Sequence, residues 1–327
     1  MHDTTFRRSI CAALLCAASA GPAPAQGAET YPSRPIRMIV PYSPGGTSDT
    51  MARILGQKMS EAWGQPVVVD IRPGASGAIG TELAARAPAD GHNLLHGNLS
   101  LFATNPFLYS KLGYSIGDFA PISLIATGPQ LLVVHPGVPA KSVQDLLQLA
   151  RAKPGALNYG SGGAGVLSNI AGEMFKMMTG ARIVHVPYKG TVLALNDLIA
   201  GQVQLIFADM PVALPQAKAG KLRAVAVTSG RRSPLLPDMA TISESGVPGY
   251  ALDNWWGVVA PRNVPKSIVA KLNGEIVRAH AMEDLKDRYA ALGLEATSST
   301  PEEFGRYIKA ESDKFGKVIK ASGAKVD

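Results

Sequence analysis

The chain has 327 residues, of which 46% are hydrophobic and 17% charged, and its formal net charge is +7. After residue 25 the lysines and arginines are scattered, and no basic run is interleaved with aromatic residues, which argues against a nucleic-acid-binding protein. About 300 residues exceed the usual size of a single domain, so we expect two lobes.

Residues 1–25 have the pattern of a secretory signal peptide. Arg7 and Arg8 precede an apolar stretch at residues 10–20, and Ala-Pro-Ala at 23–25 offers the small residues of a cleavage site. The stretch is too short to span a membrane as a helix. Both cysteines, Cys11 and Cys16, lie in this segment. We therefore expect a mature protein without a thiol nucleophile or a cysteine metal site.

The first glycine turn lies in residues 41–53, PYSPGGTSDTMAR. The apolar run at 36–40 predicts a buried strand before it, and the residues after it predict a helix to about Trp63, with Thr47, Ser48 or Asp49 as N-cap. Glycine at 45 and 46 permits close approach to the backbone, and the first N–H groups of a helix lack partners inside it. Such a turn suits a carboxylate or phosphate, although a single one often only reverses the chain.

A second glycine-rich turn follows another short strand. Residues 67–70, VVVD, predict the strand, and residues 72–81, RPGASGAIGT, predict a turn leading into a helix through about Arg86. Two such turns from neighbouring strands could hold one small anion between them. A third strand, ending at Leu95, precedes a predicted loop at 96–104 that could bring His96, Asn98 and Ser100 to the same sheet edge.

These segments resemble one known family. PIRMIVPYSPGGTSDTMAR, GQPVVVDIRPGASGAIGTELAARAPADGHNLL, HVPYKG and WWGVVAP occur in the order of the landmarks of the tripartite tricarboxylate transporter substrate-binding proteins, or Bug proteins. The resemblance runs from about Tyr31 to the C-terminus. It implies an α/β fold of the type II-like periplasmic binding proteins: two lobes, each a mostly parallel sheet flanked by helices, with a cleft between them. It also implies that the two glycine turns grip the carboxylate of a small organic acid, which the protein delivers to a membrane transporter.

The lobes are expected at residues 26–127 with 251–327, and at residues 128–250. The crossings between them, and hence the hinges, are expected near 121–135 and 250–261. The first stretch, PISLIATGPQLLVVH, is interrupted by Gly-Pro and is interpreted as too long for one strand. In the second, Trp255 and Trp256 are expected to be one packed ring and one ring nearer the cleft.

Residues 160–165, GSGGAG, match the G-x-G-x-x-G fingerprint of dinucleotide sites, between a predicted strand at 157–159 and a helix at 166–178. The acidic residue expected about 20 positions later is missing, because IVHVPYKG stands at 183–190. We therefore expect no nucleotide cofactor, and instead a turn where Ser161 and Gly162 face the first lobe. Tyr188, at the end of the next strand, is interpreted as either a ligand contact or a packed ring.

Asp209 follows a strand predicted at 203–207. It could bind an amine or hydroxyl of the ligand, or only cap the backbone. Members of the family resembled often carry an acidic residue one position earlier, directly after the phenylalanine, so the role of Asp209 stays open.

Enzymatic motifs are incomplete. Residues 74–78, GASGA, lack the last glycine of a nucleophile elbow, and His92 and His96 fall on a predicted strand and loop, which does not suit a shared metal. We expect no catalytic residue, metal or cofactor, and a monomer in the periplasm. A sensory protein that presents its ligand to a membrane sensor kinase is the alternative, and a secreted hydrolase is a weaker one. The predicted ligand-binding residues are Ser43, Gly45, Gly46, Thr47, Asp49, Ala75, Ser76, Gly77, Asn98, Ser161, Gly162, Tyr188 and Asp209.

Overall fold

The computed structural model describes residues 31–322. The predicted signal peptide, residues 1–25 with both cysteines, lies outside the described residues. Among the helices that are described, none is long and apolar enough to cross a membrane.

The strands join into one sheet that runs through the whole molecule. Its order is β2-β1-β3-β9-β4-β7-β5-β6, and β8 and β10 pair in addition with β4. The strands are β1 (Ile36–Val40), β2 (Val67–Ile71), β3 (Asn93–Asn98), β4 (Phe119–Val134), β5 (Asn158–Ser161), β6 (Val184–Pro187), β7 (Leu205–Asp209), β8 (Arg223–Val227), β9 (Asp253–Pro261) and β10 (Glu295–Ala296).

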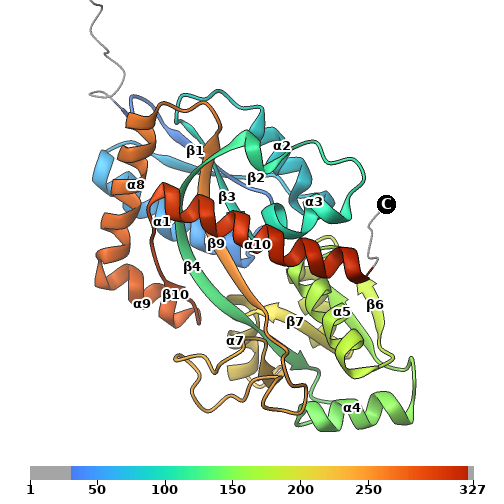
Figure 1. The fold of residues 1–327 in the computed structure, drawn as a ribbon. Helices are drawn as coiled ribbons and strands as arrows, with labels where there is room; N and C mark the ends of the chain where they lie inside the picture. The colour runs from blue at the N-terminus through green and yellow to red at the C-terminus, as the bar shows by residue number, and fades with distance from the viewer. Residues whose placement is uncertain (1–30, 323–327) are drawn as a thin grey trace, which may run out of the picture.

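Helices cover both faces of this sheet. In Figure 1, α1 and α8 lie beside the first strands, α9 lies beside β10, α10 crosses in front of the long strands β4 and β9, and α4, α5 and α7 lie around β6 and β7. The helices are α1 (Thr47–Trp63), α2 (Ala78–Ala85), α3 (Asn105–Leu108), α4 (Val143–Ala152), α5 (Leu167–Thr179), α6 (Thr191–Ile199), α7 (Met210–Lys218), α8 (Lys266–Ala281), α9 (Glu283–Ala291) and α10 (Pro301–Ser322).

Each half of the sheet contains three parallel strands. In one half β1 pairs in parallel with β2 and β3, and in the other β5 pairs in parallel with β6 and β7. Between these groups β9 and β4 run antiparallel to each other. Strand β4 leads from the first half to the second, and β9 leads back to the first half. The two strands therefore run in opposite directions.

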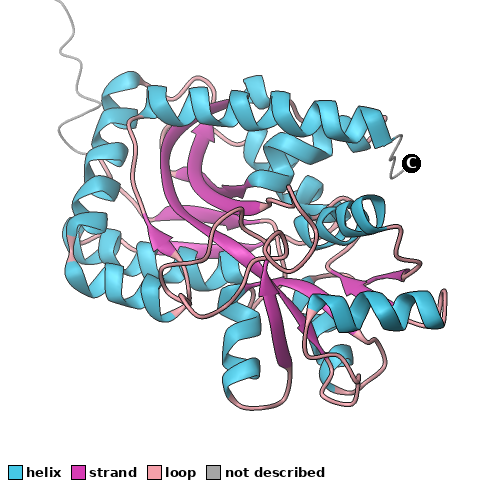
Figure 2. Ribbon diagram, turned by 60° about the horizontal axis from the view of Figure 1, so that its bottom comes forward, coloured by secondary structure: helices cyan, strands magenta, loops and turns pink. Residues whose placement is uncertain are grey.

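The long strand β4 belongs to both halves. Its first part, as far as Pro129, pairs with β9, and the part from Gln130 to Val134 pairs with β7. The expectation that this stretch is too long for one strand is therefore wrong, since it forms a single strand of 16 residues. Pro129, which has no N–H to donate, lies where the pairing changes from one neighbour to the next. Figure 2 shows the long strands curving from one group of helices to the other.

The two tryptophans of β9 pack on opposite faces of the sheet. Trp255 is 1% exposed and stacks on Phe102, whereas Trp256 is 0% exposed and belongs to a separate cluster that includes Met51. Successive side chains of a strand alternate, and helices cover both faces here, so both rings are buried. The expectation that one ring lies nearer the cleft is wrong.

The third strand also extends further than expected. β3 continues to Asn98 because Leu95 to Asn98 pair with β9, and a single π-helical turn, η2 (Ser100–Thr104), follows it. The predicted loop at 96–104 is thus a strand end and a helical turn. His96 lies inside the strand with 0% exposure and does not reach the site. Helix α9 was not predicted at all.

Candidate ligand-binding site

A partly open space, here called the inner cavity, lies between the starts of several helices. Its volume is about 60 Å³. For scale, one water molecule needs about 10–15 Å³ of such volume, so the space suits a ligand of a few atoms. Both halves of the molecule line it, through Tyr42, Ser43, Gly46, Thr47, Ser48, Asn98, Ser100, Gln130, Gly162, Val166, Leu167, Ser168, Gly190, Thr191, Val192, Asp209, Val212 and Asn254.

Four helix N-termini open onto the inner cavity. Helices α1, α5, α6 and α7 begin after Gly46, Val166, Gly190 and Asp209, and all four of these residues line the cavity. None of the four makes a side-chain capping hydrogen bond to its own helix. First-turn N–H groups have no partner within a helix, and the helix dipole is positive at this end. The combination favours a bound anion.

Three polar side chains from three strands meet at one wall of the inner cavity. Asp209 Oδ1 accepts hydrogen bonds of 3.1 Å from Gln130 Nε2 of β4 and from Asn254 Nδ2 of β9. Gln130 and Asp209 are direct partners in the pairing of β4 with β7. Burial raises the pKa of the Asp209 carboxyl, and hydrogen bonds from Gln130 and Asn254 oppose that rise.

A larger outer cavity of about 490 Å³ adjoins the inner one. The two share Tyr42, Ser43, Gly162 and Gly190 as lining residues. The outer cavity is lined by Pro41, Tyr42, Ser43, Pro73, Gly74, Ala75, Ser76, Gly77, Tyr109, Gly162, Gly163, Ala164, Tyr188, Lys189 and Gly190.

The two glycine turns therefore line different cavities. Gly46 and Thr47 line the inner cavity, whereas Ala75 to Gly77 line the outer one. The Tyr42 ring stands beside the second turn, since a Cβ added to Gly77 would lie 3.2 Å from Tyr42 Cζ. Its hydroxyl donates a 2.7 Å hydrogen bond to Asn98 Oδ1. That both turns hold one anion stays a prediction, and in this geometry a ligand would have to reach past Tyr42.

The second turn has an unusual backbone. Ala75 and Ser76 have φ angles of 46° and 53°, the positive values that residues with a Cβ rarely adopt. Two hydrogen bonds hold the turn: Asn105 Nδ2 donates to the Ser76 carbonyl over 3.1 Å, and Ser76 Oγ donates to the Ala164 carbonyl over 2.6 Å. Strain of this kind is frequent at functional sites.

Further hydrogen bonds join the two halves around the cavities. Ser43 Oγ donates to the Lys189 carbonyl over 3.0 Å, and Thr104 Oγ1 donates to the Gly165 carbonyl over 2.9 Å. The Leu167 N–H donates to Ser100 Oγ over 3.1 Å. The halves thus meet through neutral groups, which include the backbone carbonyls of Ala164, Gly165 and Lys189.

Comparison with known proteins identifies the family. Residues 51–324 match the tripartite tricarboxylate transporter family receptor. The chain belongs to this family. It is 38% identical to the UPF0065 protein in the tcbD-tcbE intergenic region of Pseudomonas sp. (strain P51), over 96% of this chain and 94% of that protein. It is 35% identical to protein BugT of Bordetella pertussis, over 94% and 95% of the two chains.

Solved structures agree with this assignment. R. palustris Rpa4515 with adipate has 38% sequence identity and a TM-score of 0.87, over 90% of this chain and 98% of that one. MatC from Rhodopseudomonas palustris with bound malate has 30% identity and a TM-score of 0.84, over 88% and 100%. The periplasmic binding protein BugD has 33% identity and a TM-score of 0.86, over 90% and 99%. The predicted family and the periplasmic-binding-protein fold are confirmed, and this is a family of solute-binding receptors.

Two predicted residues of the first turn lie away from both cavities in this receptor. The Gly45 N–H donates to Asp49 Oδ2 over 2.8 Å, and Asp49 Oδ1 lies 2.6 Å from Arg53 Nε. Asp49 is 5% exposed. The carboxylate turns back onto its own loop, so Gly45 and Asp49 shape the turn instead of lining the site. The N-cap of α1 is Gly46, and not one of the three polar residues that were expected.

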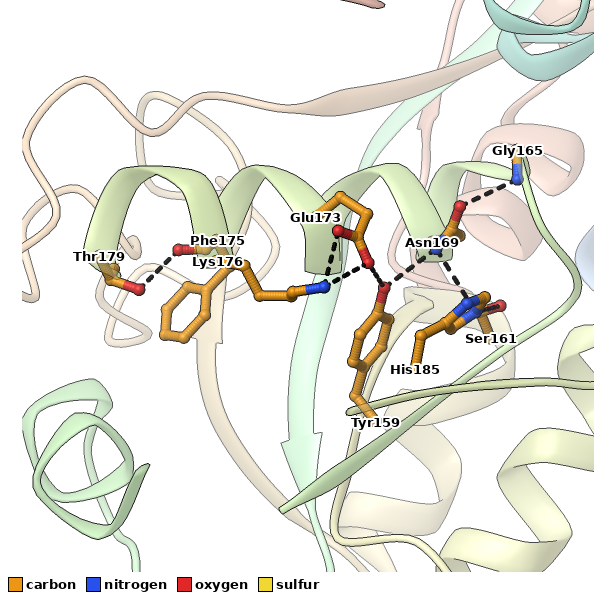
Figure 3. Close-up of polar contacts among 9 residues, drawn as sticks. All are labelled: Tyr159, Ser161, Gly165, Asn169, Glu173, Phe175, Lys176, Thr179 and His185. Carbon is orange, nitrogen blue, oxygen red and sulfur yellow. Dashed lines mark hydrogen bonds and ion pairs between the residues drawn. The ribbon is translucent and has the colours of Figure 1, made fainter. Parts of the chain in front are cut away.

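Ser161 is also directed into the protein. It is 0% exposed, its Oγ lies 2.6 Å from His185 Nε2, and it accepts a 3.1 Å hydrogen bond from the Gly163 N–H. Figure 3 shows this pair beneath α5, next to Tyr159 and Asn169. Burial lowers the pKa of His185. The Ser–His contact has the composition of a hydrolase pair, but a serine without access to the cavities serves to hold the glycine loop. The expectation that Ser161 faces the cleft is corrected.

The remaining predicted residues do line the cavities. Ser43, Gly46, Thr47, Asn98, Gly162 and Asp209 line the inner one, and Ala75, Ser76, Gly77 and Tyr188 the outer one. The Tyr188 hydroxyl donates to Asp197 Oδ2 over 2.7 Å. Sequence reasoning missed Gln130 and Asn254. For Gln130 the sequence did contain a signal that could have indicated a site residue, because it is a polar residue inside the long apolar run ATGPQLLVVH.

Proposed function

We propose that this receptor captures a small organic carboxylate in the inner cavity and delivers it to the membrane components of a tripartite tricarboxylate transporter. The observation that carries the proposal is the convergence of four helix N-termini, whose N-cap residues provide no side-chain hydrogen bond, on one small cavity. Backbone N–H groups and helix dipoles together form a ready site for an anion. The adipate and malate bound to two related proteins support this assignment.

The ligand is enclosed by movement of two lobes. We assign residues 26–127 with 251–327 to one lobe and residues 128–250 to the other, with β4 and β9 as the connections. Hinges of this type absorb closure in a few residues at the ends of elements. The hydrogen bonds between Ser43 and Lys189 and between Ser76 and Ala164 are then contacts of the closed form.

The receptor acts in the periplasm, to which the predicted signal peptide directs it, and as a monomer. Light scattering of the protein that lacks residues 1–25 tests the oligomeric state: a mass near one chain is expected, and a stable dimer would contradict it.

A thermal-shift screen of that same protein tests the ligand class. Binding to the native state alone stabilises by RT ln(1 + [L]/Kd), about 2.7 kcal/mol at a hundredfold excess over Kd. We expect a rise in melting temperature with carboxylates, and none with sugars or nucleotides. A response confined to sugars or nucleotides would contradict the proposal.

Delivery needs a separate experiment. Uptake of the radiolabelled carboxylate found in the screen should be lost in cells without this gene and restored by its expression. If uptake is unchanged while the purified receptor binds the compound, the receptor serves another membrane partner, such as a sensor kinase.

A further inference from the structure

One wall of the inner cavity is formed by Asp209 and the two amide side chains that donate to it. Gln130 is 2% exposed, and its Oε1 atom is buried without a hydrogen-bond partner among the described residues. The Gln130 amide nitrogen beside it is committed to Asp209 Oδ1. Asn254 is committed as well, because its Nδ2 donates to Asp209 and its Oδ1 accepts from the Trp255 N–H.

The Asp209 carboxylate faces neutral groups. The side chains that act on it are Gln130, Asn254 and Thr47, and none of these carries a charge. Within the described part of the chain, Asp209 is the one residue lining the inner cavity with a formal charge at neutral pH. A buried carboxylate without a cationic partner is costly, and a buried acceptor without a donor adds to the cost.

The opposite character prevails at the helix starts that line the same cavity, where N–H donors and positive dipole ends gather. One small space of about 60 Å³ thus combines an anion-binding side with a side that carries one negative charge. A ligand that matches both sides has a carboxylate at one end and a donor at the other.

We propose that the inner cavity selects an amino acid-like zwitterion, whose carboxylate lies at the helix N-termini and whose primary or secondary ammonium group donates to the Asp209 carboxylate. This rests on the proposed function of the site. An ammonium group supplies several N–H donors and a positive charge, which suit the Asp209 carboxylate. A hydroxyl supplies one donor and no charge, and a second carboxylate supplies neither and is repelled by Asp209.

Matched ligands provide the test. Isothermal titration of the protein without residues 1–25 compares alanine, lactate and propionate, and then aspartate, malate and succinate. Within each set the compounds differ in one substituent. The amino compound is expected to bind about tenfold or more tightly than its hydroxy counterpart, as charged hydrogen bonds exceed neutral ones by this order.

Two variants assign the effect to its residue. Asp209→Asn keeps the shape of the side chain and should weaken binding of the amino compound by about tenfold or more, while binding of the hydroxy compound changes by less than about threefold. Asp238→Asn removes the same charge from an exposed residue that lines neither cavity, and should change nothing. The comparison within wild type does not depend on the folding of either variant.

The inference is overturned if propionate or succinate binds as tightly as its amino counterpart, or if Asp209→Asn binds the amino compound like wild type. In those cases carboxylate binding itself, and with it the proposed function, still stands. If no compound of either set binds and the thermal-shift screen responds to sugars or nucleotides alone, the proposed function fails as well.

Discussion

Ser76 Oγ lies 2.6 Å from the carbonyl oxygen of Ala164, a residue 88 positions further along the chain and in the other half of the molecule. Ser43 Oγ makes a similar contact, over 3.0 Å, with the carbonyl oxygen of Lys189. Both donors belong to the glycine turns of the first half, and both acceptors belong to loops that line the outer cavity. These two hydroxyls therefore connect the halves directly across the site.

Removing both hydroxyls should make the bound ligand leave faster. A neutral hydrogen bond contributes about 0.5–1.5 kcal/mol, so Ser43→Ala with Ser76→Ala should raise the dissociation rate constant by about tenfold. Stopped-flow displacement measures this rate, and small-angle scattering should show a larger radius of gyration for the ligand-free variant. Ser298→Ala, at an exposed serine, is the control. Unchanged dissociation in the double variant would mean that these contacts do not hold the closed form.

Two glycines should respond in opposite directions to substitution by alanine. A Cβ at Gly257 of β9 would lie 2.1 Å from Cζ of the fully buried Phe304, so Gly257→Ala should lower the free energy of unfolding by about 1–3 kcal/mol. Gly274 lies inside α8 with nothing within 4 Å of an added Cβ, and Gly274→Ala should raise it by about 0.5–1 kcal/mol. Urea unfolding measures both, and changes of the same sign would contradict the packing described.

His96 should make the protein less stable in acid. Burial lowers its pKa from 6.5 to about 4, and neither ring nitrogen has a hydrogen-bond partner among the described residues. Between these two pH values the unfolded chain binds a proton that the folded protein does not. Stability conferred by neutral His96 is thus complete above pH 6.5 and falls as the pH drops toward 4, by about 3 kcal/mol in all.

A leucine at this position cannot titrate. The slope of unfolding free energy against pH should therefore decrease in His96→Leu between pH 6.5 and pH 4. It should not vanish, because burial also lowers the pKa of His185 and of His280. A slope equal to that of wild type would show that His96 does not titrate differently in the folded protein.

The local pattern around the first turn was sufficient to predict its elements. The observed strand, Ile36–Val40, and the end of the helix at Trp63 are those expected from an apolar run and an amphipathic stretch, whereas the helix starts earlier than expected, at Thr47 with Gly46 as N-cap. Gly64, with a φ of 64°, ends the helix in the left-handed conformation that glycine favours. Residues close together in the sequence therefore determine the strand, the turn and the helix in this part of the chain.

The composition of the site was harder to predict, because it depends on pairing between distant strands. Gln130 and Asn254 reach Asp209 only through the register of β4 with β7 and with β9. Asp49 carries the residue type of a site but turns onto the Gly45 N–H, which no spacing rule reveals. The position of Tyr42 between the two turns likewise arises from the packed structure.

The N–H groups at the start of α1 are expected to bind the ligand carboxylate, and Gly46→Asp is the variant that tests this. The φ of Gly46, −78°, suits any residue, and aspartate is a favoured N-cap, whereas an added Cβ would lie 3.2 Å from the Ser43 carbonyl oxygen. The fold should persist, and the melting temperature of the variant checks this. The new carboxylate would occupy the N–H groups that the ligand needs and repel its charge. Gly274→Asp places the same charge on an exposed part of α8 as the control.

Isothermal titration with the carboxylate found in the screen decides the question. We expect Gly46→Asp to bind at least about a hundredfold more weakly than wild type, while Gly274→Asp binds as wild type does. A folded Gly46→Asp protein with wild-type affinity would mean that the carboxylate binds elsewhere.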